Sequence, residues 1–333
     1  MKILVTGAAG FIGSHLSKNL ANKGFEVFGI DNFADYYSPN YKKLRVKEFD
    51  LESSCHFRYV DLLDYQSVEK IFKMTKPNYI IHLAAQAGIR LPLIKNMQYI
   101  DSNVSAYLNV IRASINSNVT GIMYASSSSV YGDDSPIPFT ENSLLLRPKS
   151  LYGVTKLMNE QMSRVFSQLN NIKFRGLRFF TVYGPWGRPD MAYFKLASAS
   201  LGEYDFSLFG DGSTKRDFTN IDDVVACSEK LLIEFMERDS KSNDIVNIGG
   251  SDPKSINQLI EEFRKHQETD FELVHLDAIT QDSLVTVANH DYMFELIGPH
   301  QFKPLEVGVA ELITWAKKPS IKNNLASWID STY

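Results

Sequence analysis

Short apolar runs alternate with longer amphipathic segments along the first half of the chain. The runs are rich in β-branched and aromatic side chains, which predicts buried strands. They lie at residues 2–6, 26–30, 57–60, 79–83, 121–125 and 174–180. The amphipathic segments predict helices at residues 14–23, 65–74, 99–117 and 149–169. This alternation is typical of a parallel sheet with helices on both faces, so we expect an α/β fold built on a Rossmann-like doubly wound sheet.

The pattern becomes less regular after residue 180. Stretches rich in Gly, Pro or polar residues predict loops at 183–189 and 209–217. The other expected elements are helices at 190–201, 222–237, 255–268 and 307–317 and a strand at 245–248. We predict a dinucleotide-binding domain over residues 1–180 and a smaller C-terminal α+β substrate domain over residues 181–333. The segment near 222–248 is expected to return to the first domain.

Composition narrows the class of protein. The 333 residues are enough for about two domains, and the net charge of −4 comes from interspersed charges of both signs. We therefore expect neither a nucleic-acid nor a membrane surface. Cys55 and Cys227 show no metal-ligand pattern, and no apolar run reaches membrane-spanning length. The chain starts with a strand rather than a signal peptide, which predicts a cytoplasmic protein. The cysteine pattern predicts that it holds no metal.

A glycine-rich turn follows the first predicted strand. The sequence Gly7-Ala-Ala-Gly10-Phe-Ile-Gly13 leads directly into a helical stretch. Glycines let the backbone bend tightly and approach a pyrophosphate, whose charge is held by the N–H groups of a helix N-terminus. We therefore expect Gly7, Gly10, Phe11, Ile12 and Gly13 to bind a dinucleotide.

The ends of the later strands indicate which dinucleotide is bound. Asp31 and Asn32 follow the second strand, about 20 residues after the glycines, where a carboxylate accepts hydrogen bonds from the adenosine ribose and repels a 2′-phosphate. This favours NAD. Further cofactor contacts are expected at Asp61 and Leu62, beside the adenine, and at the mostly small residues Leu83, Ala84, Ala85 and Gln86.

The strongest chemical signal is the pair Tyr152 and Lys156, one helical turn apart on one face of a helix. A tyrosine takes the proton of a substrate hydroxyl if its pKa, near 10 in water, is lowered. The Lys156 ammonium, together with a positively charged nicotinamide, favours the phenolate. Tyr152 and Lys156 are also expected to contact the cofactor, Lys156 by donating to the nicotinamide ribose. Ser127 and, less directly, Ser129 are expected to hydrogen-bond the oxygen of the substrate hydroxyl.

These motifs resemble the extended short-chain dehydrogenase/reductases, and among them the NAD-dependent epimerase/dehydratase family of nucleotide-sugar enzymes. The resemblance rests on the glycine loop, Asp31-Asn32, Leu83-Ala-Ala-Gln86, Tyr124-Ala-Ser-Ser-Ser-Ser-Val-Tyr-Gly132, Tyr152 with Lys156, and Arg216-Asp-Phe218. The stretches 31–37 and 177–192 are similar to the UDP-glucuronate 4-epimerase group. The resemblance extends over residues 1–225.

The resemblance implies a tightly bound NAD, a UDP-sugar substrate and a homodimer in which helices 99–117 and 149–169 pair with their symmetry mates. It adds Asn103 and Val182 to the expected cofactor contacts. The expected substrate contacts are Arg90, Ser127, Ser128, Ser129, Thr181, Arg188 and Arg216.

The reaction type depends on acids that this chain lacks. In the resembled family, a 4,6-dehydratase has an Asp-Glu pair where Ser128 and Ser129 stand, and a decarboxylase has a glutamate at the position of Ser129. We therefore expect C4 epimerisation through a 4-keto intermediate, interconverting UDP-glucuronate and UDP-galacturonate. The alternatives are another nucleotide-sugar epimerase, of the UDP-glucose or UDP-GlcNAc type, a net oxidoreductase, a dehydratase, or a non-catalytic dinucleotide sensor.

Several other polar residues receive structural interpretations. His82 lies inside a buried strand and is expected to be a core histidine. Asp222 and Asp223 open a helix, where carboxylates satisfy N–H groups. The basic residues Lys42, Lys43 and Arg45 are expected to form a solvated face, with the alternative that one of them reaches the adenosine end of the cofactor.

Overall fold

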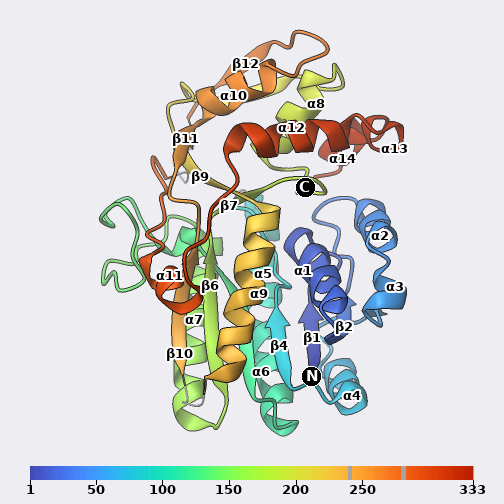
Figure 1. Ribbon diagram of the computed structural model, residues 1–333, viewed down its shortest axis with the longest axis vertical. Helices are drawn as coiled ribbons and strands as arrows, with labels where there is room; N and C mark the ends of the chain where they lie inside the picture. Colours follow the sequence, from blue (N-terminus) through green and yellow to red (C-terminus); the bar gives the residue numbers. More distant parts are fainter. Residues whose placement is uncertain (90, 239–241, 279–282, 333) are drawn as a thin grey trace.

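The computed structural model of the protein describes residues 1–89, 91–238, 242–278 and 283–332. In these residues, seven parallel strands form the main sheet, in the order β10-β6-β5-β4-β1-β2-β3 (Figure 1). They are β1 (Lys2–Thr6), β2 (Glu26–Asp31), β3 (Arg58–Tyr59), β4 (Tyr79–His82), β5 (Gly121–Ser127), β6 (Lys173–Phe179) and β10 (Asn243–Ile248). The strand order reverses between β1 and β4, which is where this architecture binds ligands.

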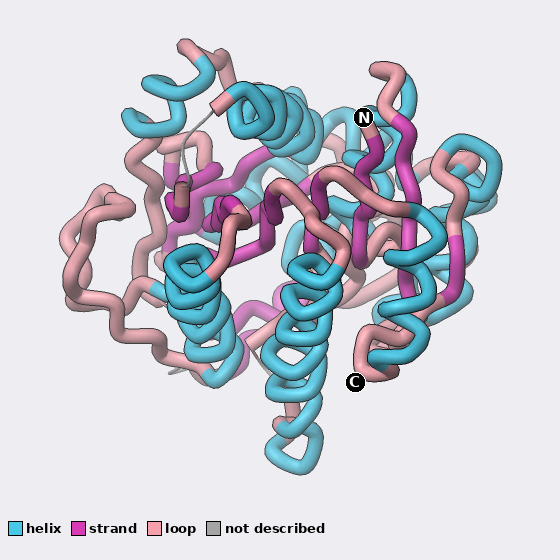
Figure 2. Tube along the Cα trace, turned by 90° about the horizontal axis from the view of Figure 1, so that it is seen from below, coloured by secondary structure: helices cyan, strands magenta, loops and turns pink. Residues whose placement is uncertain are grey.

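Helices cover both faces of the main sheet (Figure 2). Helices α1 (Phe11–Asn22), α9 (Ile221–Glu237) and α11 (Asp291–Ile297) lie on one face, and α4 (Tyr65–Thr75), α6 (Ala106–Asn116) and α7 (Leu151–Leu169) lie on the other. Neighbouring residues of one strand therefore enter different cores. Ile3 and Val5 pack with the first group of helices and Leu4 with the second. This explains why the strands read as continuous apolar runs.

Smaller elements gather beyond the carboxyl ends of the main strands, in the upper part of Figure 1. One sheet contains β11 (Pro253–Ser255), β9 (Lys215–Asn220) and β7 (Thr181–Tyr183), and a second pairs β12 (Leu273–Leu276) with β8 (Phe206–Phe209). The helices of this region are α8 (Ala192–Ser200), α10 (Ile256–Arg264), α12 (Leu305–Ala316), α13 (Pro319–Lys322) and α14 (Leu325–Asp330). The predicted fold, a Rossmann-like sheet with a smaller α+β region, is confirmed.

Three sequence predictions are wrong in their details. The single helix predicted at 99–117 consists of α5 (Met97–Tyr99), a π-helical turn at Ile100–Ser105 and α6. The loop predicted at 209–217 contains the start of β9. Helix α2 (Pro39–Glu48), followed by the short α3 (Leu51–Ser54), replaces the expected solvated face, because Arg45 is fully buried and Lys42 is only 8% exposed.

Strand β10, which follows the irregular part of the sequence, is an edge strand of the main sheet, next to β6. The domain limits at residues 180 and 181 stay a prediction. In the described part of the chain, no helix combines the length and the apolar composition that a membrane crossing requires.

Candidate active site

A cavity of about 500 Å³ lies at the carboxyl ends of β1, β2, β4, β5 and β6, where the smaller elements face the main sheet. Most of the predicted site residues line it together. They are Gly7, Gly10, Phe11, Ile12, Gly13, Asp31, Asn32, Asp61, Leu62, Leu83, Ala84, Ala85, Gln86, Ser127, Ser128, Ser129, Tyr152, Lys156, Thr181, Val182, Arg188 and Arg216. Arg90 lies outside the described residues.

The glycine loop has the shape that a dinucleotide diphosphate requires. Gly7 has a φ of +73°, and a Cβ on Gly13 would lie 2.0 Å from the Gly7 carbonyl oxygen, so the turn excludes side chains at these positions. Helix α1 follows at once, and among the described residues no side chain caps its N-terminus. Its first N–H groups therefore remain available to an anion in the cavity.

Asp31 is held rigidly at the end of β2. Its carboxylate accepts hydrogen bonds from the Ala9 N–H at 3.1 Å and from the Phe33 N–H at 2.8 Å. The first bond ties the end of β2 to the glycine loop. An adenosine ribose would thus meet a carboxylate that is already oriented, as the sequence predicts.

Asn103 does not line the cavity, in contrast to the prediction that it contacts the cofactor. Its side chain is 1% exposed and lies behind the cavity wall. The side-chain oxygen accepts the Gln86 N–H at 2.7 Å, and the side-chain nitrogen donates to the Gln86 carbonyl at 3.1 Å and to Thr155 Oγ1 at 2.9 Å. Asn103 therefore holds Gln86, which does line the cavity, against α7.

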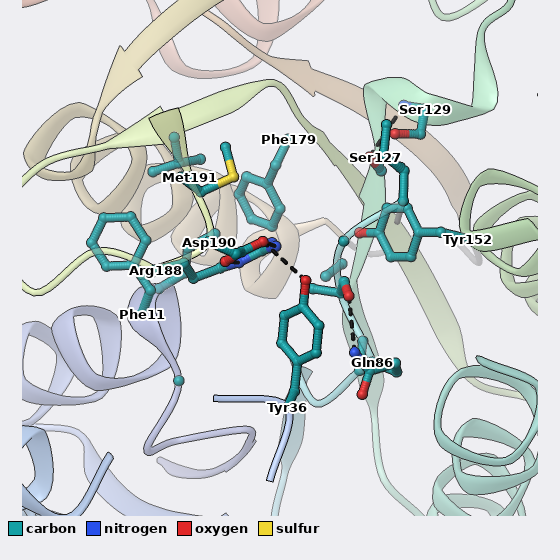
Figure 3. A pocket seen from close by; sticks show the side chains of 18 of the residues that line it. Phe11, Tyr36, Gln86, Ser127, Ser129, Tyr152, Phe179, Arg188, Asp190 and Met191 are labelled. Carbon is teal, nitrogen blue, oxygen red and sulfur yellow. Dashed lines mark hydrogen bonds and ion pairs between the residues drawn. The ribbon is translucent and has the colours of Figure 1, made fainter. Parts of the chain in front are cut away.

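Tyr152 projects from α7 beside Ser127 at the end of β5 (Figure 3). Burial raises the pKa of Tyr152, while the positive charge of Arg188 and a hydrogen bond with Ser127 act in the opposite direction. In the protein alone, the phenol is therefore protonated at neutral pH. The sequence did not predict that the Arg188 cation would oppose this rise in the pKa of Tyr152.

Lys156 lies one turn after Tyr152, and its Nζ is 5.8 Å from the centre of the Tyr152 ring. Nζ donates to the Ala125 carbonyl oxygen at 2.8 Å, which anchors the side chain to the end of β5. Burial lowers the pKa of Lys156 to about 7. Without an anion nearby, its ammonium form is much less favoured than that of a lysine in water.

Arg188 is paired within the cavity wall, which the sequence did not predict. Its Nε and Nη2 donate to the two oxygens of Asp190 at 3.0 and 2.5 Å, and the Tyr36 hydroxyl donates to the same carboxylate at 3.0 Å. Burial alone would raise the pKa of Asp190, but the Arg188 cation and the hydrogen bonds hold it below its usual range. Figure 3 shows this group facing the Tyr152 side of the cavity.

A second buried ion pair fixes the strand that carries the serines. Glu160, one turn beyond Lys156 on α7, accepts hydrogen bonds from Ser126 Oγ at 2.6 Å and from two Arg178 nitrogens at 2.8 Å each. Arg178 also donates to the Tyr131 hydroxyl at 2.7 Å. The end of β5, with Ser127, is thereby locked to the helix that bears Tyr152.

The protein is similar over most of its length to proteins of one known family. Residues 3–249 match the NAD dependent epimerase/dehydratase family. The protein belongs to this family. The family assignment confirms the predicted resemblance and the predicted cofactor, NAD. This epimerase/dehydratase family protein also shares its α/β fold with solved structures of the family.

Three relatives of this family member illustrate the similarity. Protein CapI of Staphylococcus aureus is 37% identical over 331 residues, covering 95% of this chain and 98% of that protein. UDP-glucuronate 4-epimerase 4 of Arabidopsis thaliana is 37% identical over 272 residues, covering 78% of this chain and 62% of that protein. The crystal structure of UDP-glucuronic acid 4-epimerase from Bacillus cereus, in complex with UDP-glucuronic acid and NAD, has a TM-score of 0.86 and 31% identity over 96% of this chain and 99% of that chain.

Proposed function

We propose that the protein is a UDP-glucuronate 4-epimerase, which interconverts UDP-glucuronate and UDP-galacturonate through a transient 4-keto intermediate. The observation that carries this proposal is the set of side chains around Tyr152. Hydroxyls of Ser127, Ser128, Ser129 and Thr181 line the cavity together with the Arg188 cation. Among the described residues lining this end, the carboxylate is Asp190, which Arg188 and a tyrosine already engage. Among these described residues, no carboxylate is therefore free to act as the acid of a dehydration.

The catalytic roles follow from the same contacts. Tyr152 accepts the proton of the C4 hydroxyl and later returns a proton, while Ser127 keeps the sugar oxygen in line with the phenol. The glycine loop, Asp31 and Lys156 would hold NAD, which when bound supplies a hydride acceptor and a positive charge. Because burial raises the pKa of Tyr152 in the protein alone, the phenol needs added positive charge before it acts as a base.

The substrate carboxylate requires its own binding groups. Oxidation at C4 creates a β-keto acid, which loses CO₂ readily when the C5–carboxylate bond stands perpendicular to the new carbonyl. Hydroxyls from Ser127 to Ser129 and Thr181 would hold the carboxylate away from that alignment without adding an acid. Among the described residues, Arg188 uses Nε and Nη2 for Asp190, so its Nη1 remains for the sugar's negative charge.

The test is to incubate the protein with NAD and UDP-glucuronate and to identify the products by NMR. We expect UDP-galacturonate with little pentose product, and about 10²-fold less product in the same time from a matched Tyr152→Phe sample. UDP-xylose as the main product would indicate a decarboxylase instead. Activity confined to UDP-glucose would show that the hydroxyl cluster does not select an acidic sugar.

We also propose that the protein is a cytoplasmic homodimer. In the described residues, Cys55 and Cys227 are free and buried, as expected in a reducing compartment. Helix α7 exposes apolar side chains along one stripe, formed by Leu151, Val154, Met158, Val165 and Leu169. Such a stripe on a surface helix suits burial against a symmetry-related copy.

A further inference from the structure

Among the residues that the structure describes, Arg45 is a fully buried cation without an anionic partner. Its side chain, on helix α2, is 0% exposed. Among the described residues, its hydrogen-bond acceptors are backbone carbonyls and a tyrosine hydroxyl, and its Nε has no acceptor. Burying a charge that no opposite charge neutralises is costly. The position of this charge therefore calls for a functional explanation.

The guanidinium joins two loops that both contribute residues to the cavity lining. Nη1 donates to the Ala9 carbonyl at 2.7 Å, in the glycine loop, and to the Tyr37 hydroxyl at 3.1 Å. Nη2 donates to the carbonyls of Trp186 and Gly187 at 2.7 and 3.3 Å. No lysine side chain could make both sets of bonds at once, because an ammonium is a single point donor whereas a guanidinium is a fork.

Each loop leads directly to a different part of the site. In the glycine loop, the Ala9 N–H donates to Asp31 and the Ala9 carbonyl accepts from Arg45. These two side chains therefore fix both backbone polar groups of Ala9. In the other loop, Trp186 adopts a φ of +61°, and the chain continues to Arg188 and Asp190 in the cavity wall. The 184–191 loop is therefore bonded to the glycine loop through one side chain.

We propose that Arg45 is a positioning residue that couples dinucleotide binding at the glycine loop to the ordering of the 184–191 loop. A diphosphate at the N-terminus of α1 would bring negative charge close to this buried cation and favour its present location. With Arg45 held there, the Trp186 and Gly187 carbonyls are fixed, and Arg188 is presented to the sugar. The proposal depends on NAD binding and not on the identity of the sugar.

The test compares three variants of the full-length protein. Arg45→Lys keeps the charge but loses the bridge, and Arg45→Gln loses both. Tyr41→Phe is the matched control, because the Tyr41 hydroxyl donates to the same Gly187 carbonyl at 3.0 Å without carrying a charge. NAD affinity is measured by calorimetry, and hydrogen exchange of the 184–191 segment is measured with and without NAD.

In the wild type, we expect NAD to slow exchange in this segment by about tenfold or more, within the usual range of coupling between sites. Arg45→Lys should keep NAD affinity within about threefold but reduce the NAD-dependent protection to less than about twofold. Arg45→Gln should bind NAD at least about tenfold more weakly. Tyr41→Phe should speed exchange equally with and without NAD, so that the protection ratio is unchanged.

Three results would overturn the proposal. One is the absence of NAD-dependent protection in the wild type, which decides the matter even if the Arg45 variants do not fold. Another is full protection in Arg45→Lys, which would mean that the bridge is not needed. The third is wild-type NAD affinity in Arg45→Gln, which would make the buried charge irrelevant to the cofactor.

Discussion

At the scale of single residues, the hydroxyl of Tyr152 is the group on which the proposed chemistry depends. Replacing it in Tyr152→Phe removes one oxygen and leaves the ring packed in place. We expect turnover to fall by about 10²-fold or more, the usual contribution of a positioned acid/base. NAD affinity and the circular dichroism spectrum should be unchanged, since the glycine loop and Asp31 lie elsewhere in the cavity.

Tyr59→Phe is the control for this substitution, because Tyr59 is 67% exposed and lies at the edge strand β3. Its turnover should match the wild type. If Tyr152→Phe also turned over normally, another group would have to move the C4 proton.

Lys156 gives a prediction about pH. Burial lowers its pKa in the folded protein from 10.5 to about 7. The buried charge therefore destabilises the cofactor-free fold fully below pH 7, and this cost declines as pH rises towards 10.5. Lys156→Met should raise the free energy of unfolding relative to the wild type by about 3 kcal/mol more at pH 6 than at pH 9. Urea unfolding of both proteins at the two pH values measures this difference.

The same substitution should act in the opposite direction on function. Without the ammonium, Lys156→Met should lose turnover as severely as Tyr152→Phe and bind NAD more weakly. Lys43→Met, on the exposed side of α2, controls for the loss of a lysine. If Lys156→Met bound NAD as tightly as the wild type, the expected contact with the nicotinamide ribose would be wrong.

At the scale of elements, the two faces of α7 have different roles. One face carries Lys156 and Glu160 into the core, and the opposite face exposes the apolar stripe that includes Val154 and Met158. Met158→Glu should place a charge in the proposed dimer contact and yield a monomer by light scattering at micromolar concentration. Met74→Glu on α4 is the matched control, because Met74 is an exposed methionine outside the stripe. A wild-type protein that is itself monomeric would contradict the proposed dimer.

The main sheet was predictable because its strands are buried on both faces and so read as uninterrupted apolar runs. Helix α2 was not, since its sequence is strongly polar and its amphipathic pattern is weak. Two of its basic residues, Lys42 and Arg45, are buried. Arg45 packs 4.7 Å above the Tyr41 ring and bonds to Trp186, a residue 141 positions later in the chain. Contacts of this range carry no local signal.

The candidate site was predictable to the extent that it follows strand ends. Parallel strands bring their carboxyl ends to one edge, so motifs after β1, β2, β4 and β5 meet in one cavity. The pairing of Arg188 with Asp190 and Tyr36 was missed, although both partners lie in the two stretches that resemble the epimerases. Asn103 was expected to contact the cofactor from the family resemblance, and the helical periodicity of its segment does not distinguish a residue that lines a wall from one that supports it.

At the scale of the whole molecule, the cavity connects the main sheet to the smaller sheets. Its lining runs from Asp31 and Asp61 at one end, past Tyr152, to Phe209 and Arg216 on the smaller sheets. A ligand that spans this length contacts both regions and should stabilise them together.

An epimerase that returns hydride to its own substrate has no need to release its cofactor. The purified protein should therefore show the absorbance of bound NAD(H), whereas a net reductase should be purified mostly without cofactor.

NAD should therefore stabilise the folded protein, and NADP⁺ should do so much less. A ligand at 100 times its Kd raises the free energy of unfolding by about 2.7 kcal/mol. Asp31 is held by two backbone N–H groups, so it cannot easily turn away from a 2′-phosphate of like charge. Thermal unfolding of the cofactor-free protein with each dinucleotide measures the difference. Asp31→Asn should narrow the gap between the two midpoints, and Asp35→Asn, an exposed neighbour outside the cavity lining, should leave it unchanged. Equal or greater stabilisation of the wild type by NADP⁺ would show that Asp31 does not select the cofactor.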